Sequence, residues 1–248
     1  MSDFDPRAVP VRPAATVMLV RDGRTGIEVL MLRRTTTAVF AAGVHVFPGG
    51  RVDAADDTDV PGGGEWRTGL DPAAADARLA VPSGGRAHWV AALRESFEEA
   101  GLLLARRSDG TPLTFSDRAA AERFAAYRDA LHRGELTLGE LCRREELVLP
   151  LGELRYVSHW VTPVGPPRRF DTRFFVARAP QGQDPVHDDS ETIASEWLAP
   201  DVALERHEAG EIGLFAPTIA NLGFLSVHDS VDAVLRTADG LGTVPVRR

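Results

Sequence analysis

Three carboxylates and an arginine lie within six positions at residues 94–99, where the sequence is RESFEE. Each residue of an α-helix turns by about 100°, so Glu95, Glu98 and Glu99 would share one face of a helix. Like charges on neighbouring turns repel one another by roughly a few tenths of a kcal/mol per pair. A divalent cation converts that repulsion into binding, and oxygen-only ligands favour a hard ion such as Mg²⁺ or Mn²⁺. The segment is therefore a candidate metal site.

A solvated acidic helix surface is the alternative interpretation, because most charge runs are surface features. In that case Arg94 would only pair with Glu98, four residues further along the helix. The upstream segment Phe47-Pro48-Gly49-Gly50 favours a site, since glycines allow the backbone to approach a ligand closely. This context weakens the surface interpretation, and both interpretations stay open at this point.

A helix over residues 86–101 would position these carboxylates. Apolar residues recur three and four positions apart in and just beyond it, at Trp89, Leu93, Phe97, Ala100 and Leu104. This spacing gives one apolar stripe, which we expect to face the core on the side opposite the glutamates. Gly101 is the expected C-terminal cap, because glycine readily adopts the left-handed conformation.

The other expected elements are strands interleaved with helices. Strands are predicted at residues 15–20, 27–33, 44–47, 155–161, 173–177 and 196–198, the first two as a hairpin. Helices are predicted at 116–133 with Ser116 as N-cap, at 137–146 from a Thr137–Glu140 capping box, and at 200–209, 217–225 and 230–238. Because no strict βαβ rhythm is present, the pattern predicts an α/β protein with helices on a mixed sheet.

The same pattern suggests the domain organisation. Residues 1–13 are expected to be a flexible tail, and residues 14–240 to form a single domain. Residues 57–86 are rich in Gly, Asp, Pro and Ala and have little apolar periodicity, so we expect a surface insertion there.

Composition and charge limit the class of protein. The chain has 28 basic residues, all of them arginine, against 36 acidic residues, and a net charge of −8 argues against a general nucleic-acid binder. The single cysteine, Cys142, cannot form an internal disulfide, which favours a reducing compartment. No apolar run reaches the ~18 residues of a membrane helix, and the first residues contain no apolar signal core. We therefore expect a cytoplasmic protein that does not bind membranes.

The glutamate segment resembles the Nudix box, G-x5-E-x7-R-E-U-x-E-E-x-G-U, in which U is apolar. The second half of the box is matched by Arg94, Glu95, Glu98, Glu99, Gly101 and Leu102. Gly50 matches the first glycine, and Asp56 stands where the first glutamate belongs. The chain departs from the pattern at Asp56, at Ser96 in an apolar position, and in a gap of 37 residues (57–93) where the box has seven.

Two further segments resemble one branch of this family, the branch of the peroxisomal coenzyme A diphosphatase, in which the box also carries long insertions. Residues 30–50 approximate its coenzyme A pattern, L-L-T-x-R-S-x3-R-x3-G-x3-F-P-G-G. An apolar pair, Arg34, Gly43 and FPGG agree, whereas Leu32 and Val39 stand where the threonine and the second arginine belong. The segments WVTP at 160–163 and RRFDTRFF at 168–175 are also similar to that branch.

The resemblance implies the Nudix α/β/α sandwich with a mixed sheet, plus a helical insertion near residues 110–147 and C-terminal helices near 200–240. It implies hydrolysis, with Mg²⁺ or Mn²⁺, of a small-molecule nucleoside diphosphate linked to another group, with coenzyme A or acyl-coenzyme A as the first candidate. ADP-ribose, NADH and dinucleoside polyphosphates stay open as substrates, as does a non-catalytic ligand-sensing module. Members of the family often dimerise, so a homodimer is an expected assembly, although the sequence shows no interface.

The resemblance also assigns roles to residues. Glu98 and Glu99 would be the main metal ligands, and Glu95 would be a ligand or the base for the attacking water. Arg94 would orient these carboxylates, and the Gly50 carbonyl would complete the coordination. Arginine forks bind phosphate in bidentate fashion, and the substrate-binding candidates are Arg33, Arg34, Gly49 and Arg169, with Arg168 about equally placed.

Residues outside the box supply weaker candidates for the general base. Glu191, in a downstream acidic stretch, is the first of these candidates. His45, His159 and His187 are others, although a lone histidine is more often structural. Cys142 has no histidine near it in the sequence, and we interpret it as a structural residue.

Overall fold

A mixed β-sheet forms the centre of the computed structural model, which describes residues 5–35, 44–58, 65–115, 117–186 and 192–248. The strand order is β10-β2-β1-β9-β8-β11, with β3 paired to β2 and β4 paired to β1. Strand β1 pairs in parallel with β9 and antiparallel with β2 and β4, which makes the sheet mixed as predicted. The strands of this sheet are β1 (Val11–Asp22), β2 (Ile27–Arg34), β3 (His45–Val46), β4 (Gly49–Arg51), β8 (Arg155–Val161), β9 (Arg169–Arg178), β10 (Thr192–Leu198) and β11 (Val246–Arg247).

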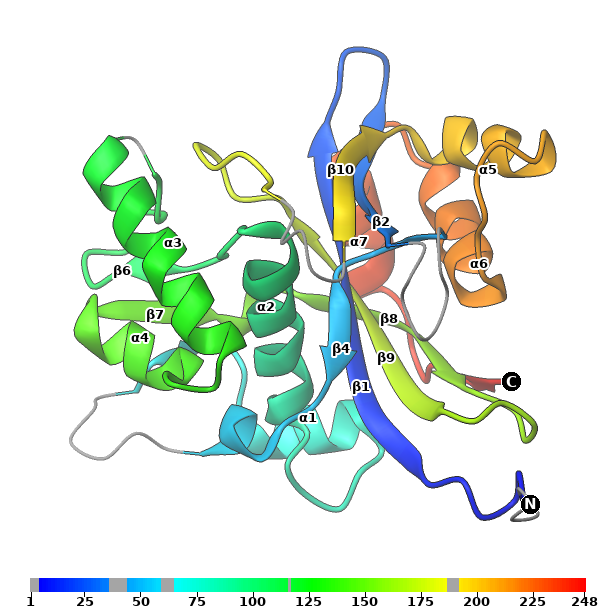
Figure 1. The fold of residues 1–248 in the computed structure, drawn as a ribbon, viewed down its shortest axis with the longest axis horizontal. Helices are drawn as coiled ribbons and strands as arrows, with labels where there is room; N and C mark the ends of the chain where they lie inside the picture. Colours follow the sequence, from blue (N-terminus) through cyan, green and yellow to red (C-terminus); the bar gives the residue numbers. More distant parts are fainter. Residues whose placement is uncertain (1–4, 36–43, 59–64, 116, 187–191) are drawn as a thin grey trace.

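Helices cover both faces of this sheet (Figure 1). On one face lies α2 (Arg86–Ala100), and on the other lie α5 (Pro200–Glu208), α6 (Ala216–Ser226) and α7 (Val231–Asp239). Residues of β1 alternate between two apolar clusters: Val17 packs on the α2 side, and Met18 on the α6 and α7 side. The expected α/β/α sandwich is confirmed.

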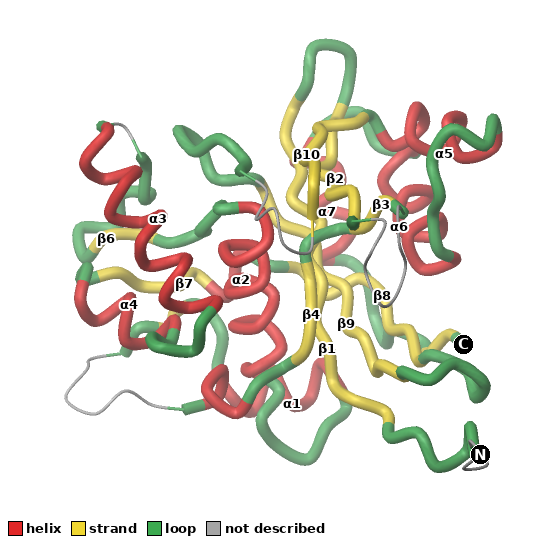
Figure 2. Tube along the Cα trace, in the orientation of Figure 1, coloured by secondary structure: helices red, strands yellow, loops and turns green. Residues whose placement is uncertain are grey.

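A smaller unit packs against the outer side of α2 (Figure 2). It consists of helices α3 (Arg118–His132) and α4 (Leu138–Arg144) and a short sheet of β5 (Arg67–Thr68), β7 (Leu147–Pro150) and β6 (Arg106–Arg107). The ring of Phe124 on α3 lies 6.4 Å from that of Phe97 on α2, centroid to centroid. This unit is the predicted helical insertion, and its capping box is present: the Glu140 N–H donates to the Thr137 hydroxyl.

The segment 57–86 has more structure than the sequence suggested. The 3-10 turn η1 (Ala54–Asp57) precedes it, and it contains β5 and the helix α1 (Pro72–Leu79). Trp66 and Leu79 are buried in the main apolar cluster. The sequence did not indicate these two elements, because a two-residue strand and a two-turn helix are too short to show a period.

Two sheet boundaries also differ from the expected ones. Strand β1 begins at Val11, inside the expected tail, because its first residues pair with β9, with Val11 opposite Arg169. Strand β11 lies beyond residue 240, where Val246 pairs with His159 of β8. Ser116 lies outside the described residues; the N-cap of α3 is Asp117, whose carboxylate accepts from the Ala120 N–H.

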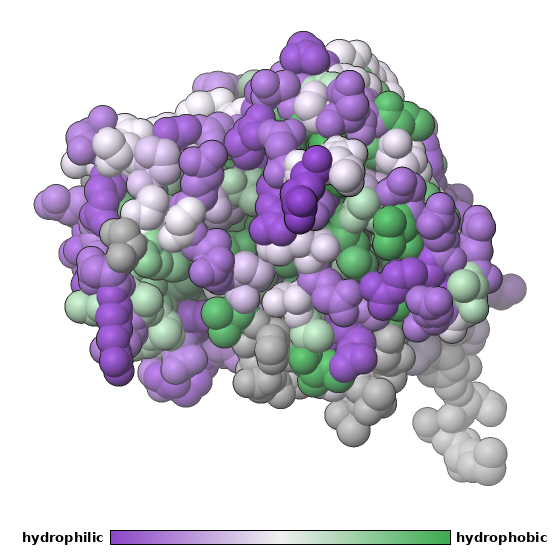
Figure 3. Space-filling model, turned by 90° about the horizontal axis from the view of Figure 1, so that it is seen from above, coloured by the Kyte–Doolittle hydropathy of each residue, from purple (hydrophilic) through white to green (hydrophobic). Residues whose placement is uncertain are grey.

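The surface is that of a globular chain. Charged and polar residues cover most of the face shown in Figure 3, and the hydrophobic residues on it are scattered in small groups. Among the described helices, none is long and apolar enough to cross a membrane.

Cys142 provides a test of the core. Its thiol lies fully buried on α4, and burial raises its pKa to about 12. Because the thiolate is the reactive form, we expect the native chain not to react with an aromatic disulfide reagent at pH 8. The absorbance of the released thiolate should then rise to one equivalent in denaturant. Rapid reaction of the native chain would contradict this packing.

Candidate active site

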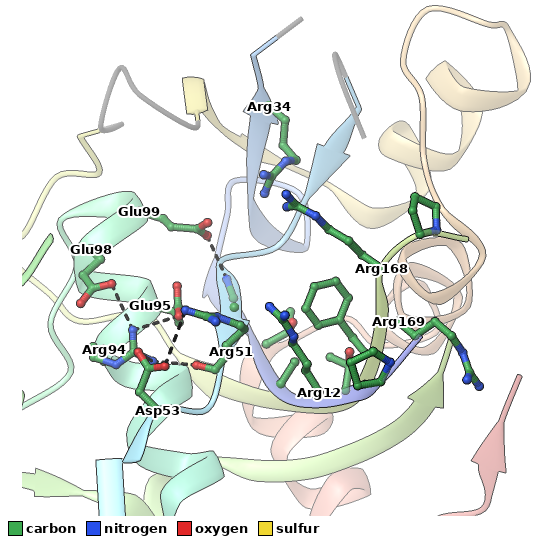
Figure 4. A pocket seen from close by; sticks show the side chains of 18 of the residues that line it. Arg12, Arg34, Arg51, Asp53, Arg94, Glu95, Glu98, Glu99, Arg168 and Arg169 are labelled. Carbon is green, nitrogen blue, oxygen red and sulfur yellow. Dashed lines mark hydrogen bonds and ion pairs between the residues drawn. The ribbon is translucent and has the colours of Figure 1, made fainter. Parts of the chain in front are cut away.

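A cavity of about 750 Å³ lies between α2 and the strands β4, β1 and β9 (Figure 4). Carboxylates of α2 line one side, namely those of Glu95, Glu98 and Glu99. Arginines from β1, β2 and the β8–β9 hairpin line the opposite side, namely Arg12, Arg34, Arg168 and Arg169. The cavity therefore presents an acidic wall to a basic wall.

The glycines of β4 allow the acidic wall to form. A Cβ atom built on Gly50 would fall 2.5 Å from Cδ of Glu95, so only glycine leaves room for that carboxylate. The Gly49 N–H donates to Oε2 of Glu99 at 2.9 Å. Both glycines stay paired with β1, opposite Ala15 and Thr16. Strand β4 thus lies between helix α2 and the cavity, and its two glycines leave room for the helix carboxylates to reach the cavity.

The guanidinium of Arg94 connects the parts of the site. Its Nε and Nη2 donate to the two carboxylate oxygens of Asp56, at 2.9 and 3.1 Å. Its Nη1 donates to Glu95 at 2.9 Å and to Glu98 at 3.1 Å. Nη2 also donates to the carbonyl of Arg51 at 2.7 Å. One buried side chain thereby joins helix α2, the end of β4 and the turn η1, and it contacts two of the carboxylates that it was expected to orient.

Asp56 replaces the longer glutamate of the sequence pattern without losing this partner. The 3-10 turn brings its carboxylate to Arg94, and the side chain is 1% exposed. Burial raises the pKa of Asp56, while the hydrogen bonds from Arg94 act in the opposite direction. Ser96, the second departure, is buried, and its hydroxyl donates to the Leu102 carbonyl at 2.9 Å just beyond the helix.

The three glutamates are not a solvated surface. The side chains of Glu95 and Glu98 are each 13% exposed, and Glu99 is buried. Burial raises the pKa of Glu95 to about 7, with the charge of Glu98 adding to the effect and Arg94 opposing it. Burial also raises the pKa of Glu98. The helix thus holds buried negative charge that a cation would stabilise.

The donor set fits a hard divalent cation. Three carboxylates line one cavity, beside the backbone of Gly50, and all are oxygen donors. Within the described ranges, no group of three or more His, Cys, Asp or Glu side chains is already arranged to hold an ion. Arg94 and the Gly49 N–H now occupy oxygens of Glu95, Glu98 and Glu99. The three glutamates are therefore suitable metal ligands, and in this structure their oxygens accept hydrogen bonds from Arg94 and from the Gly49 N–H.

The substrate-binding candidates are placed differently from one another. Arg34 lines the cavity, whereas Arg33, the preceding residue of β2, is exposed and is not among the lining residues, since neighbours on a strand face opposite sides. Arg169 lines the wall, but its Nε donates to the Thr162 carbonyl at 3.1 Å. Arg168 extends toward Arg34 (Figure 4).

Of the candidate bases outside the box, the two that the structure describes do not line the cavity. His45 and His159 are buried, and neither lines the cavity. Glu191 and His187 lie outside the described residues. Arg12 is a lining residue that sequence reasoning missed, because its segment was expected to be a tail. The only signal for it would have been the pairing of β1 with β9, which no local pattern shows.

Comparison with solved structures gives the class of protein. The crystal structure of a Nudix hydrolase from Alicyclobacillus acidocaldarius superposes with a TM-score of 0.71 at 29% identity, covering 96% of this chain and 100% of that chain. The fold is therefore that of a Nudix hydrolase, an enzyme of diphosphate hydrolysis.

The family follows from the sequence. Residues 11–225 match the model of the NUDT19 Nudix domain, and the chain belongs to this family. The acyl-coenzyme A diphosphatase NUDT19 of Gallus gallus is 30% identical, over 91% of this chain and 72% of its own length. The human acyl-coenzyme A diphosphatase NUDT19 is 32% identical, over 77% of this chain and 58% of its own length. The predicted family is confirmed, and the chain spans only part of the length of these relatives.

Gly50→Ala tests whether the absence of a side chain at Gly50 is what allows the Glu95 carboxylate to lie in the cavity. The new methyl group must displace the Glu95 carboxylate, and a misplacement of about 1 Å can cost about 10²-fold in rate. We expect kcat to fall by about that factor while the melting temperature stays within a few degrees, because the displaced group is a side-chain end. The matched control is Gly223→Ala on α6, where a Cβ meets no atom within 4 Å. Equal activity of the two variants would contradict the assignment.

Proposed function

We propose that this chain hydrolyses the diphosphate linkage of coenzyme A or of an acyl-coenzyme A, with Mg²⁺ or Mn²⁺. The observation that carries the proposal is the cavity with buried carboxylates on one wall and arginines on the other. A diphosphate requires both a cation and positive side chains. The activity in the names of the two NUDT19 relatives supports coenzyme A derivatives as the substrate class.

The bound cation would neutralise charge on the diphosphate and lower the pKa of a water molecule. Glu98 and Glu99 would hold that cation, and Arg94 keeps Glu98 oriented through its Nη1. Arg34 would bind phosphate oxygens from the opposite wall.

Glu95 is the residue that we assign to proton transfer. Its carboxylate lines the cavity beside Gly50, and burial raises its pKa, which makes it a better proton acceptor than an exposed glutamate. Its Oε1 accepts from Arg94 at 2.9 Å, which makes Oε2 the atom for the proton of the attacking water. The alternative role of Glu95 as a metal ligand stays open in this proposal, as does Glu191 as a base.

A ligand-sensing module is disfavoured by the site itself. Sensors of this fold commonly lose the glutamates, whereas this chain keeps all three, two of them bonded to a buried arginine. The expected homodimer and cytoplasmic location stay predictions.

A hydrolysis screen tests the proposal directly. Coenzyme A, acyl-coenzyme A, ADP-ribose, NADH and dinucleoside polyphosphates would each be incubated with the chain and Mg²⁺ or Mn²⁺. We expect chromatography to show 3′,5′-ADP released from coenzyme A at the highest kcat/KM. A higher kcat/KM for any of the other three groups would overturn the substrate assignment. A folded chain that hydrolyses none of them would overturn the enzymatic proposal.

Glu98→Gln tests the role of the acidic wall. The amide is isosteric but neutral and a poor ligand, so we expect metal-dependent turnover to fall by about 10²-fold or more, the scale of losing one electrostatic group at a reacting centre. The fold should persist, because the change removes a buried negative charge. Glu208→Gln, at an exposed position on α5, is the matched control and should keep full activity. Near-normal turnover by the Glu98 variant would exclude it as a ligand.

A further inference from the structure

Two arginines of the basic wall are not used within the protein. Arg12 and Arg168 both line the cavity and both are exposed. Over the ranges that the structure describes, neither side chain makes a hydrogen bond or ion pair with another residue. Arg169, by contrast, donates to a carbonyl, and Arg94 is held by Asp56. The two side chains are therefore available to a ligand.

The sheet brings these arginines together. In the parallel pairing of β1 with β9, Arg12 lies opposite Phe170, two residues after Arg168. Figure 4 shows the guanidinium groups of Arg168 and Arg34 directed toward each other, with Arg12 in the same part of the cavity. Cations that gather in this way repel one another unless an anion lies among them.

Among the residues that the structure describes, no carboxylate lines that part of the cavity. The described carboxylates that line the cavity lie on its other side. Asp53 immediately precedes η1, and Glu95, Glu98 and Glu99 belong to α2. A substrate whose diphosphate lies against those glutamates, with a cation, would leave Arg12 and Arg168 unpaired. A further phosphate on the same substrate would pair with them.

We propose that Arg12 and Arg168 form a second anion subsite, which binds a phosphomonoester that the substrate carries in addition to its diphosphate. The inference rests on the proposed function for the position of the diphosphate. Guanidinium forks bind such a group in bidentate fashion. Phe170, in the same wall, offers an aromatic surface for the nucleobase. The subsite selects nucleotides with a phosphorylated ribose over those, such as ADP-ribose and NADH, whose ribose hydroxyls are free.

Coenzyme A and dephospho-coenzyme A provide the test, because they differ only in the 3′-phosphate. We expect the wild-type chain to prefer coenzyme A by about 10- to 100-fold in kcat/KM, the effect of charged hydrogen bonds. The preference should lie mainly in KM, since the group is remote from the reacting phosphorus. In the double variant R12Q/R168Q, the ratio of kcat/KM for coenzyme A to that for dephospho-coenzyme A should fall to about 1. The cause should be a higher KM for coenzyme A.

The matched control is Arg24→Gln, at an exposed position in the β1–β2 turn, which should keep the wild-type ratio. The single variants R12Q and R168Q, each with an intermediate ratio, serve in place of a double variant that does not fold. Equal kcat/KM values of the wild-type chain for coenzyme A and dephospho-coenzyme A would overturn the proposed subsite. An unchanged ratio of these two values in the variants would also overturn it.

A binding experiment separates this proposal from the proposed function. Calorimetry without metal would compare 3′,5′-ADP with 5′-AMP on the wild-type chain and on R12Q/R168Q. We expect the wild-type chain to bind 3′,5′-ADP at least about 10-fold more tightly than 5′-AMP. The variant should bind the two nucleotides with equal affinity. If neither coenzyme A form is hydrolysed, the proposed function fails, and this result still decides the subsite. Equal binding of both nucleotides to the wild-type chain would overturn it.

Discussion

The ion pair between Arg94 and Asp56 is the interaction on which the rest of the site depends. Both groups are buried, and removing one partner of such a pair typically costs about 3–5 kcal/mol. Asp56 immediately precedes the insertion at 57–86, and Arg94 lies on the helix that follows it. The pair therefore closes the insertion at its base, which explains how 37 residues can replace seven without separating the two halves of the box.

The acidic side of the site could be predicted because its geometry is local. Helical periodicity alone places Glu95, Glu98 and Glu99 on one face, and α2 runs over Arg86–Ala100 with Gly101 as its left-handed cap, as the spacing indicated. Burial of the glutamates could not be predicted, because it arises from β4. That strand was itself missed, since two consecutive glycines are poor indicators of a strand.

The basic side was only partly predictable because it depends on pairing between distant segments. Arg34 was found through its position before the FPGG segment. Arg12 belongs to residues whose exposure gives no apolar alternation, and its place in the wall follows only from the register of β1 against β9. The composition shows 28 arginines but cannot distinguish those used in ion pairs from those directed into a cavity.

The two walls of the cavity also differ in how the chain could vary over evolution. The acidic wall comes from β4, Asp53 and α2, which are held by the ion pairs of Arg94 and by close packing on the two glycines of β4. The basic wall comes from the ends of two strands, β1 and β2, and from the β8–β9 hairpin, where substitutions disturb few neighbours. Mutation of the hairpin can therefore change which molecules enter while the chemistry is inherited intact. The acidic wall therefore determines the reaction, whereas the basic wall determines the substrate and can change without it.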